Sequence, residues 1–149
     1  MGSCVKRRKP AAQVVEFPRS LGALRALFDY LEEAFEREAV DRDSAFWVTL
    51  AVEELFTNMI RHNRSNSDRI TLGLDISDDR ICARLTDYEV PPFDPSTVAP
   101  VDPTASAEDR VPGGLGVFFV RAKMDEVAYS YQNGNLSVEI SKARKSSDG

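Results

Sequence analysis

Apolar residues recur along the chain at two different spacings, which predict helices in some segments and strands in others. Between residues 20 and 37 they follow the three-four spacing of a helix that Ser20 can cap. The apolar positions of this segment are Leu21, Leu24, Phe28, Leu31 and Phe35. A second helix is predicted from Asp41 or Asp43 to Asn63, with one buried stripe. That stripe consists of Val48, Val52, Leu55, Phe56, Met59 and Ile60.

Strand-like segments lie on both sides of these helices. The short apolar run "AQVVEFP" at 12–18 ends on a proline and predicts a first strand. Residues 69–77 alternate strictly, and 80–86 follow after the turn Asp78-Asp79, so the two segments are expected to pair as a hairpin. Residues 125–142 predict two further strands joined at Asn133-Gly134.

A long proline-rich segment interrupts this regular pattern. Residues 88–112 hold six of the eight prolines and show no periodicity, which predicts a functional or mobile loop. The stretch "GGLGVFFVRAKM" at 113–124 then predicts a glycine turn leading into a helix. The whole order predicts an α+β fold: a two-layer sandwich whose mixed, mostly antiparallel sheet carries the helices on one face.

Composition narrows the class of protein. The 149 residues fit one domain, and the net charge of -5 argues against a mainly nucleic-acid-binding role, which needs a basic face. The basic clusters at 6–9 and 142–145 lie near the chain ends and are expected to be solvated. No apolar run is long enough to span a membrane. Two widely separated cysteines are too few for a disulfide-stapled secreted fold, so a reducing cytoplasm is the expected location.

Glu54 and Asn58 form the first candidate constellation. Their i, i+4 spacing places both side chains on one face of the second helix, about one turn apart. A carboxylate and an amide oxygen placed in this way can orient a hydroxyl and bind Mg²⁺, which prefers oxygen ligands. The same positions also suit an ordinary solvated face, because they lie nearly opposite the apolar stripe.

The other candidates are a glycine cluster and a single carboxylate. Gly113, Gly114 and Gly116 precede an apolar helix, where backbone N–H groups can approach a phosphate closely. The pattern is not that of a P-loop, because no Lys-Ser/Thr pair follows. Asp87 ends a strand and could accept a hydrogen bond from an adenine amine, or it could simply begin a turn before the prolines.

Together, "AVEELFTNMIRH", "LTDYEVPPFDP" and "GGLGVFFVRAKMDEVAY" resemble the ATP-binding domain of the GHKL superfamily. Within it they are most similar to the small anti-sigma-factor serine/threonine protein kinases of partner-switching systems. The resemblance covers roughly residues 12–142, which leaves a basic tail at 1–11 and a C-terminal tail at 143–149. It implies the Bergerat, or histidine-kinase-like ATPase, fold.

The resemblance also implies roles for the candidate residues. Glu54 would be the general base, and Asn58 would hold Mg²⁺ against the phosphates of ATP. Asp87 would receive the adenine amine, and the three glycines would shape the turn under the phosphates. The lone histidine, His62, matches a histidine of that helix in the family. The implied partners are a sigma factor and an anti-anti-sigma protein whose serine accepts the phosphoryl group, and a homodimer is plausible.

Glu89 departs from the family pattern. The family has glycine two residues after the aspartate, where this chain has Asp87-Tyr88-Glu89. An inward glutamate would repel phosphate and crowd the adenine, whereas an outward one would cost only backbone strain. The leading hypothesis is an ATP-dependent serine kinase that sequesters a sigma factor. The alternative is a non-catalytic interaction module on the same fold with weak or no ATP turnover.

Overall fold

The computed structural model describes residues 13–92 and 120–145. In chain order these residues form two long helices and five strands, with a short 3-10 turn η1 (Leu21–Ala23) ahead of the first helix. The helices are α1 (Leu24–Arg37) and α2 (Arg42–His62). The strands are β1 (Gln13–Pro18), β2 (Arg69–Ile76), β3 (Arg80–Asp87), β4 (Glu126–Gln132) and β5 (Asn135–Ala143).

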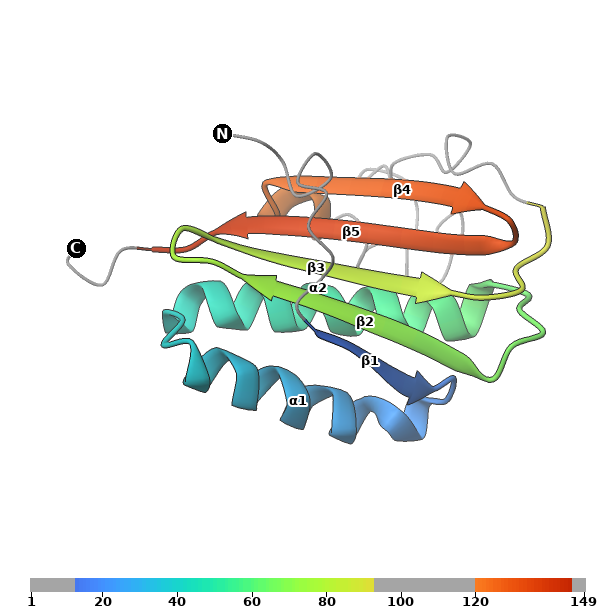
Figure 1. Cartoon of the computed structure of the whole chain (residues 1–149), viewed down its shortest axis with the longest axis horizontal. Coiled ribbons are helices and arrows are strands. Elements are labelled where there is room, and N and C mark those ends of the chain that lie inside the picture. Colours follow the sequence, from blue (N-terminus) through green and yellow to red (C-terminus); the bar gives the residue numbers. More distant parts are fainter. Residues whose placement is uncertain (1–12, 93–119, 146–149) are drawn as a thin grey trace, which may run out of the picture.

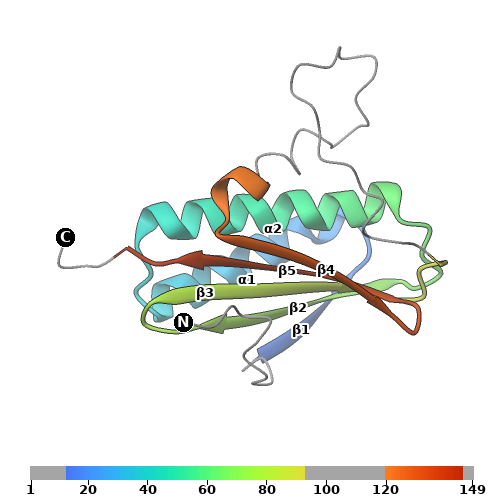
Figure 2. The ribbon, with the colours of Figure 1, turned by 90° about the horizontal axis from the view of Figure 1, so that it is seen from above.

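The strands form one sheet in the order β1-β2-β3-β5-β4 (Figure 1). All four pairings between them are antiparallel. Seen from above, both helices lie on the same side of this sheet (Figure 2). The predicted α+β sandwich, with helices on one face of an antiparallel sheet, is therefore confirmed. The predicted hairpin between the two central segments is also confirmed as β2 paired with β3.

The core lies between α2 and the inner face of the sheet. The stripe predicted for the second helix is buried except at Ile60, which is half-buried. Alternate residues of β2 and β3 meet it from the sheet, because successive side chains of a strand point to opposite faces. The inward-facing apolar residues of β2 and β3 are Ile70, Leu72, Leu74, Ile81, Ala83 and Leu85.

The first helix differs from its prediction in register. Ser20 caps the 3-10 turn η1, with its Oγ accepting a hydrogen bond from the N–H of Gly22 at 3.1 Å, and the α-helix begins only at Leu24. Leu21, expected in the core, is 43% exposed because the tighter turn rotates it outward. The buried side of α1 is formed instead by Leu27, Leu31, Ala34 and Phe35.

Two local signals of the sequence are confirmed. Asp41 is the N-cap of α2, and its carboxylate accepts a hydrogen bond from the N–H of Ser44 at 2.9 Å. Asn133 and Gly134 join β4 to β5 with φ values of 55° and 83°, as a two-residue hairpin turn with both residues left-handed requires. No helix within residues 13–92 and 120–145 is long and apolar enough to cross a membrane.

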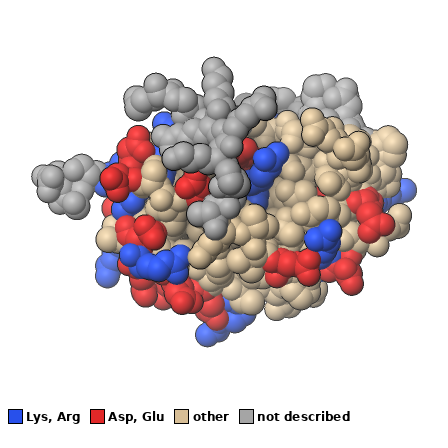
Figure 3. All heavy atoms as spheres, in the orientation of Figure 1, with Lys and Arg blue, Asp and Glu red and all other residues tan. Residues whose placement is uncertain are grey.

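The outer face of the sheet is chemically mixed. Figure 3 shows this side of the molecule, and acidic and basic side chains are interspersed on it around uncharged areas. On this face the described residues therefore form no continuous basic surface.

Candidate functional site

Asp87 is a buried carboxylate at the end of β3. It continues the inward alternation of Ile81, Ala83 and Leu85, so its side chain points toward the helix layer rather than toward solvent. The register places it between Ile70 of β2 and Leu136 of β5. With an exposed fraction of 0%, it differs from the solvated turn residue that the sequence left open as an alternative.

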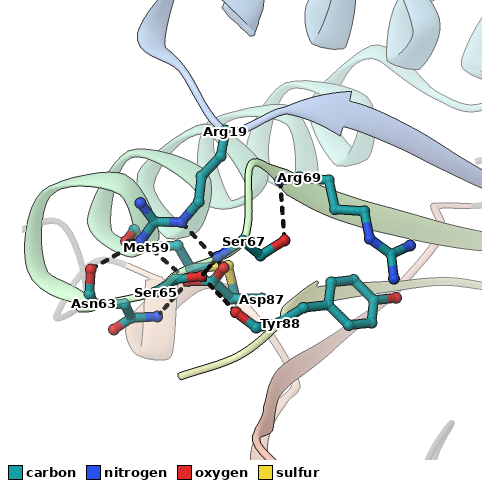
Figure 4. A network of polar contacts seen from close by, with 8 residues as sticks. All are labelled: Arg19, Met59, Asn63, Ser65, Ser67, Arg69, Asp87 and Tyr88. Carbon is teal, nitrogen blue, oxygen red and sulfur yellow. Dashed lines mark hydrogen bonds and ion pairs between the residues drawn. The ribbon is translucent and has the colours of Figure 1, made fainter. Parts of the chain in front are cut away.

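Three hydrogen bonds hold the Asp87 carboxylate beside the last turn of α2 (Figure 4). Arg19 donates from Nε to Oδ1 at 3.1 Å and from Nη2 to Oδ2 at 3.3 Å. Asn63 donates from Nδ2 to Oδ2 at 3.0 Å. The same Arg19 Nη2 donates to the carbonyl oxygens of Met59 and Asn63 at 2.5 and 2.9 Å. Arg19 therefore ties the end of β1, the end of α2 and the end of β3 together.

The occupied positions on Asp87 limit what else it can bind. An ionised carboxylate offers about four lone-pair positions, and the contacts with Arg19 and Asn63 use three of them. Within the described residues no donor occupies the second position on Oδ1, and the side chain is fully buried. The adenine contact expected for Asp87 thus stays a prediction.

Tyr88 turns to the opposite face of the sheet from Asp87. Its hydroxyl lies 2.8 Å from Oγ1 of Thr71, and the guanidinium of Arg69 stacks 4.0 Å above its ring. The hydroxyl of Ser65 donates to the Tyr88 carbonyl oxygen. These contacts fix the backbone directly after Asp87 (Figure 4).

Glu89 has a backbone conformation that favours glycine. Its φ is 53°, in the left-handed region, and its side chain is exposed. Of the two alternatives for this residue, the outward orientation is the one that the structure contains. The carbonyl oxygen of Glu89 accepts from the N–H of Asn66 at 3.2 Å, and the N–H of Val90 donates to Gly134 at 2.8 Å. The turn after Asp87 is therefore kept, at the cost of a strained residue.

Glu54 and Asn58 share one half-buried face of α2, as their spacing predicts. Burial raises the pKa of the Glu54 carboxyl, the neighbouring charge of Glu53 raises it further, and Arg61 opposes the shift. A carboxylate of raised pKa accepts a proton more readily, which suits a general base. Role assignments for both residues remain proposals.

The oxygen atoms of Glu54 and Asn58 fit a magnesium ion that is held mainly by phosphate. Mg²⁺ keeps several water or phosphate ligands and takes only one or two from protein. Within the described residues there is no group of three or more His, Cys, Asp or Glu side chains that could hold a metal alone. One amide oxygen with a carboxylate nearby is the donor set expected of such a shared site.

The remaining candidate residues are Trp47, His62 and the three glycines. Trp47 is half-buried, and the ammonium group of Lys123 lies 4.5 Å from the centre of its ring. Lys123 belongs to the helical residues 120–123, which follow the glycine segment. His62 is exposed at the end of α2. Gly113, Gly114 and Gly116 lie outside the described residues.

Sequence reasoning missed two residues of the Asp87 cluster. Arg19 is 68 positions away from Asp87 in the chain, and a single arginine after Pro18 carries no local signal of a buried ion pair. Asn63 directly follows α2 and resembles an ordinary polar residue at a helix end. Only the pairing of β1 with β2 could have indicated the contact between Arg19 and Asp87, because it brings their two chain segments to one edge of the fold.

Comparison with known proteins identifies relatives of this arrangement. Two serine-protein kinases named RsbW, from Staphylococcus aureus strains bovine RF122 / ET3-1 and MRSA252, are each 27% identical to the chain over 121 residues. The matched region covers 75% of this chain and 74% of each relative. The predicted similarity to small serine-protein kinases is confirmed at this level.

Two solved structures share the fold. A structure of the RsbU and RsbW domains of Rv1364c from Mycobacterium tuberculosis superimposes with a TM-score of 0.64 at 13% identity, covering 91% of this chain and 34% of that one. The SiaB–SiaC complex from Pseudomonas aeruginosa gives 0.57 at 14% identity, with 89% of both chains covered. Residues 17–142 match the histidine kinase-like ATPase domain, and the chain therefore belongs to that family.

Proposed function

We propose that the protein is an ATP-dependent protein serine/threonine kinase that also acts as an anti-sigma factor. The observation that carries this proposal is the arrangement along α2, where Glu54 and Asn58 share a half-buried face and Asp87 lies at the helix end. Nine residues separate Glu54 from Asn63, about 13 Å at 1.5 Å per residue. This spacing suits an extended nucleotide with its base near Asp87 and its phosphates near Asn58.

Glu54 supplies the acid–base chemistry in this mechanism. Its carboxylate accepts the proton of the attacking serine hydroxyl as the new oxygen–phosphorus bond forms and ADP leaves. The amide oxygen of Asn58 would be one ligand of Mg²⁺, which would neutralise phosphate charge. The one open position on Asp87 Oδ1 selects the adenine amine, and Arg19 keeps the carboxylate in place for it. Gly113, Gly114 and Gly116 are proposed to line the phosphates.

The partners are proposed from the resemblance to partner-switching kinases. The phosphoryl acceptor would be a serine of an anti-anti-sigma protein, and the sequestered partner a sigma factor, both in the cytoplasm. A homodimer of the kinase is part of the same proposal. The 27% identity to the kinases named RsbW supports this class of reaction.

A second candidate function, a protein-interaction module with weak or no ATP turnover, is favoured by one observation. Asp87 is fully buried and already accepts three hydrogen bonds, so its carboxylate can act as a structural centre without any nucleotide. In that case Arg19 would be the permanent partner of Asp87 rather than a support for adenine binding.

Phosphotransfer to a candidate acceptor separates the two functions. Any small anti-anti-sigma protein found in a neighbouring reading frame is incubated with this chain and Mg-ATP, and phosphoserine is detected by mass spectrometry. Glu54→Gln should abolish transfer while nucleotide binding survives, and Glu33→Gln, on the exposed face of α1, should leave transfer unchanged. Equal transfer by the Glu54 variant would remove this residue from the mechanism.

A further inference from the structure

A groove of about 470 Å³ lies between α1 and α2. It belongs to neither the Asp87 cluster nor the Glu54 face. Apolar side chains from both helices and their connection line it. They are Phe28, Phe35, Val40, Ala45, Phe46 and Leu50. Phe46 is the most exposed of them, with 59% of its surface accessible, so it offers the groove a large apolar side chain.

The groove gives α2 a second stripe of regularly spaced residues. Arg42, Ala45, Phe46, Thr49, Leu50 and Glu53 line it. These positions recur every three or four residues, as do the core positions of the same helix. At about 100° per residue, the middle of this stripe lies more than 100° around the helix axis from the middle of the core positions. It lies at a similar angle from Glu54 and Asn58. The helix therefore has three faces: one for the core, one for the candidate catalytic residues and one that lines the groove.

The groove is acidic along its sides. Glu32 and Glu36 of α1 and Glu53 of α2 line it, and Arg42 is the one cation among the described lining residues. Glu32 and Glu36 are one turn apart on the exposed side of α1, so both carboxylates border the same side of the groove. A ligand with apolar anchors and flanking lysine or arginine side chains would complement it.

Its dimensions suit a helix. The lining residues of α2 span eleven positions from Arg42 to Glu53, about 16 Å or three helical turns. A third helix packs into the groove between two others through side chains at i, i+3, i+4 and i+7. From the stripe, the exposed Phe46 and the acidic borders, we infer that this groove is the docking site for a basic amphipathic helix of a partner protein.

A synthetic peptide tests this inference without knowledge of the partner. The probe is a capped peptide of about 18 leucine and lysine residues at helical spacing, long enough to form a helix when bound. Its control has glutamate in place of every lysine. The sole tryptophan, Trp47, stacks edge to face on Phe46 with ring centres 5.0 Å apart, so its fluorescence reports occupancy of the groove. The lysine peptide should bind and the glutamate peptide should not.

Matched variants make the test specific to the groove. Phe46→Ser removes an exposed anchor and should weaken binding about tenfold or more, measured by anisotropy of a labelled peptide, with the folding transition unchanged. Glu32→Lys with Glu36→Lys should reverse the preference toward the glutamate peptide. Glu33→Lys is the matched control, because Glu33 is exposed on α1 but does not line the groove. It should bind like the unaltered chain.

Four results would overturn the inference. Equal peptide affinity for the unaltered chain and the Phe46 variant would show that the peptide binds elsewhere, and an equal loss with Glu33→Lys would show general charge attraction. A dimer that dissociates with Phe46→Ser in sedimentation would assign the groove to a second copy of the chain. Peptide affinity that rises when lysines and arginines 6–9 are neutralised would assign it to the chain's own basic segment.

Discussion

Removal of the Arg19 guanidinium should destabilise the fold more than loss of any surface ion pair. Its side chain is 12% exposed, and its partner Asp87 is fully buried. Arg19→Met keeps the apolar stem but leaves the Asp87 carboxylate with Asn63 alone and the Met59 and Asn63 carbonyl oxygens without their arginine donor. Breaking one side of a buried ion pair costs about 3–5 kcal/mol, and the partial exposure of Arg19 places the expected loss near 3 kcal/mol.

Urea unfolding at neutral pH, followed by Trp47 fluorescence and far-UV circular dichroism, measures this loss. The control is Arg25→Met, since Arg25 forms an exposed i, i+4 pair with Asp29 at 3.4 Å and should cost at most about 0.5 kcal/mol. Adding Asp87→Asn to Arg19→Met should recover about 1–3 kcal/mol relative to the sum of the single changes. A loss for Arg19→Met no larger than that of the control would refute the role of this pair as the joint between β1, α2 and β3.

Three further predictions concern backbone strain, helix capping and the pH dependence of transfer. Glu89→Gly, and likewise Ala39→Gly, should stabilise the protein by about 0.5–1 kcal/mol in urea unfolding, because both residues have a left-handed φ of 53°. If neither change stabilises the protein, the backbone at these residues is not strained. Asp41→Ala should cost about 1 kcal/mol at neutral pH. Burial raises the pKa of Asp41, but hydrogen bonds from Ser44 and Lys145 outweigh burial and lower the pKa. The stability that the Asp41 cap contributes is therefore present above the unfolded pKa of about 3.9 and is lost as pH falls through the lower folded value. A cost of Asp41→Ala that persists in acid would refute this role. Phosphotransfer needs ionised Glu54, and both burial and the charge of Glu53 raise the pKa of this carboxyl. The transfer rate should therefore fall with decreasing pH at a value above the usual pKa of about 4.3. Glu53→Gln should shift this fall in rate to lower pH, and an unshifted fall would exclude the effect of Glu53 on Glu54.

Period and spacing were sufficient to predict the framework. Alternation in β2 and β3 predicted their pairing. The three-four spacing of α2 predicted both its buried stripe and the shared face of Glu54 and Asn58. These features depend on local geometry that a few neighbouring residues determine.

Long-range contacts and local strain could not be predicted in the same way. Arg19 reaches Asp87 only because β1 pairs with β2 at the sheet edge, and nothing within several residues of Arg19 indicates this. The left-handed backbone at Glu89 is imposed by contacts with Asn66 and through Val90, against the preference of a glutamate. The 3-10 turn that exposes Leu21 begins at a capping serine that the sequence also permits to start an α-helix. Tertiary packing overrides local preference at each of these places.

Calorimetric titration of the full chain with ATP and with the matching triphosphate of unsubstituted purine, each with and without Mg²⁺, tests the central claim most directly. Changing the ligand leaves the buried Arg19–Asp87 pair intact, which a substitution at Asp87 would not. If Asp87 receives the adenine amine, Mg-ATP should bind and the analogue without the amine should bind about tenfold or more weakly, as for a lost hydrogen bond to a charged group. Absence of ATP binding at millimolar nucleotide would contradict the claim that this chain is a nucleotide-dependent kinase.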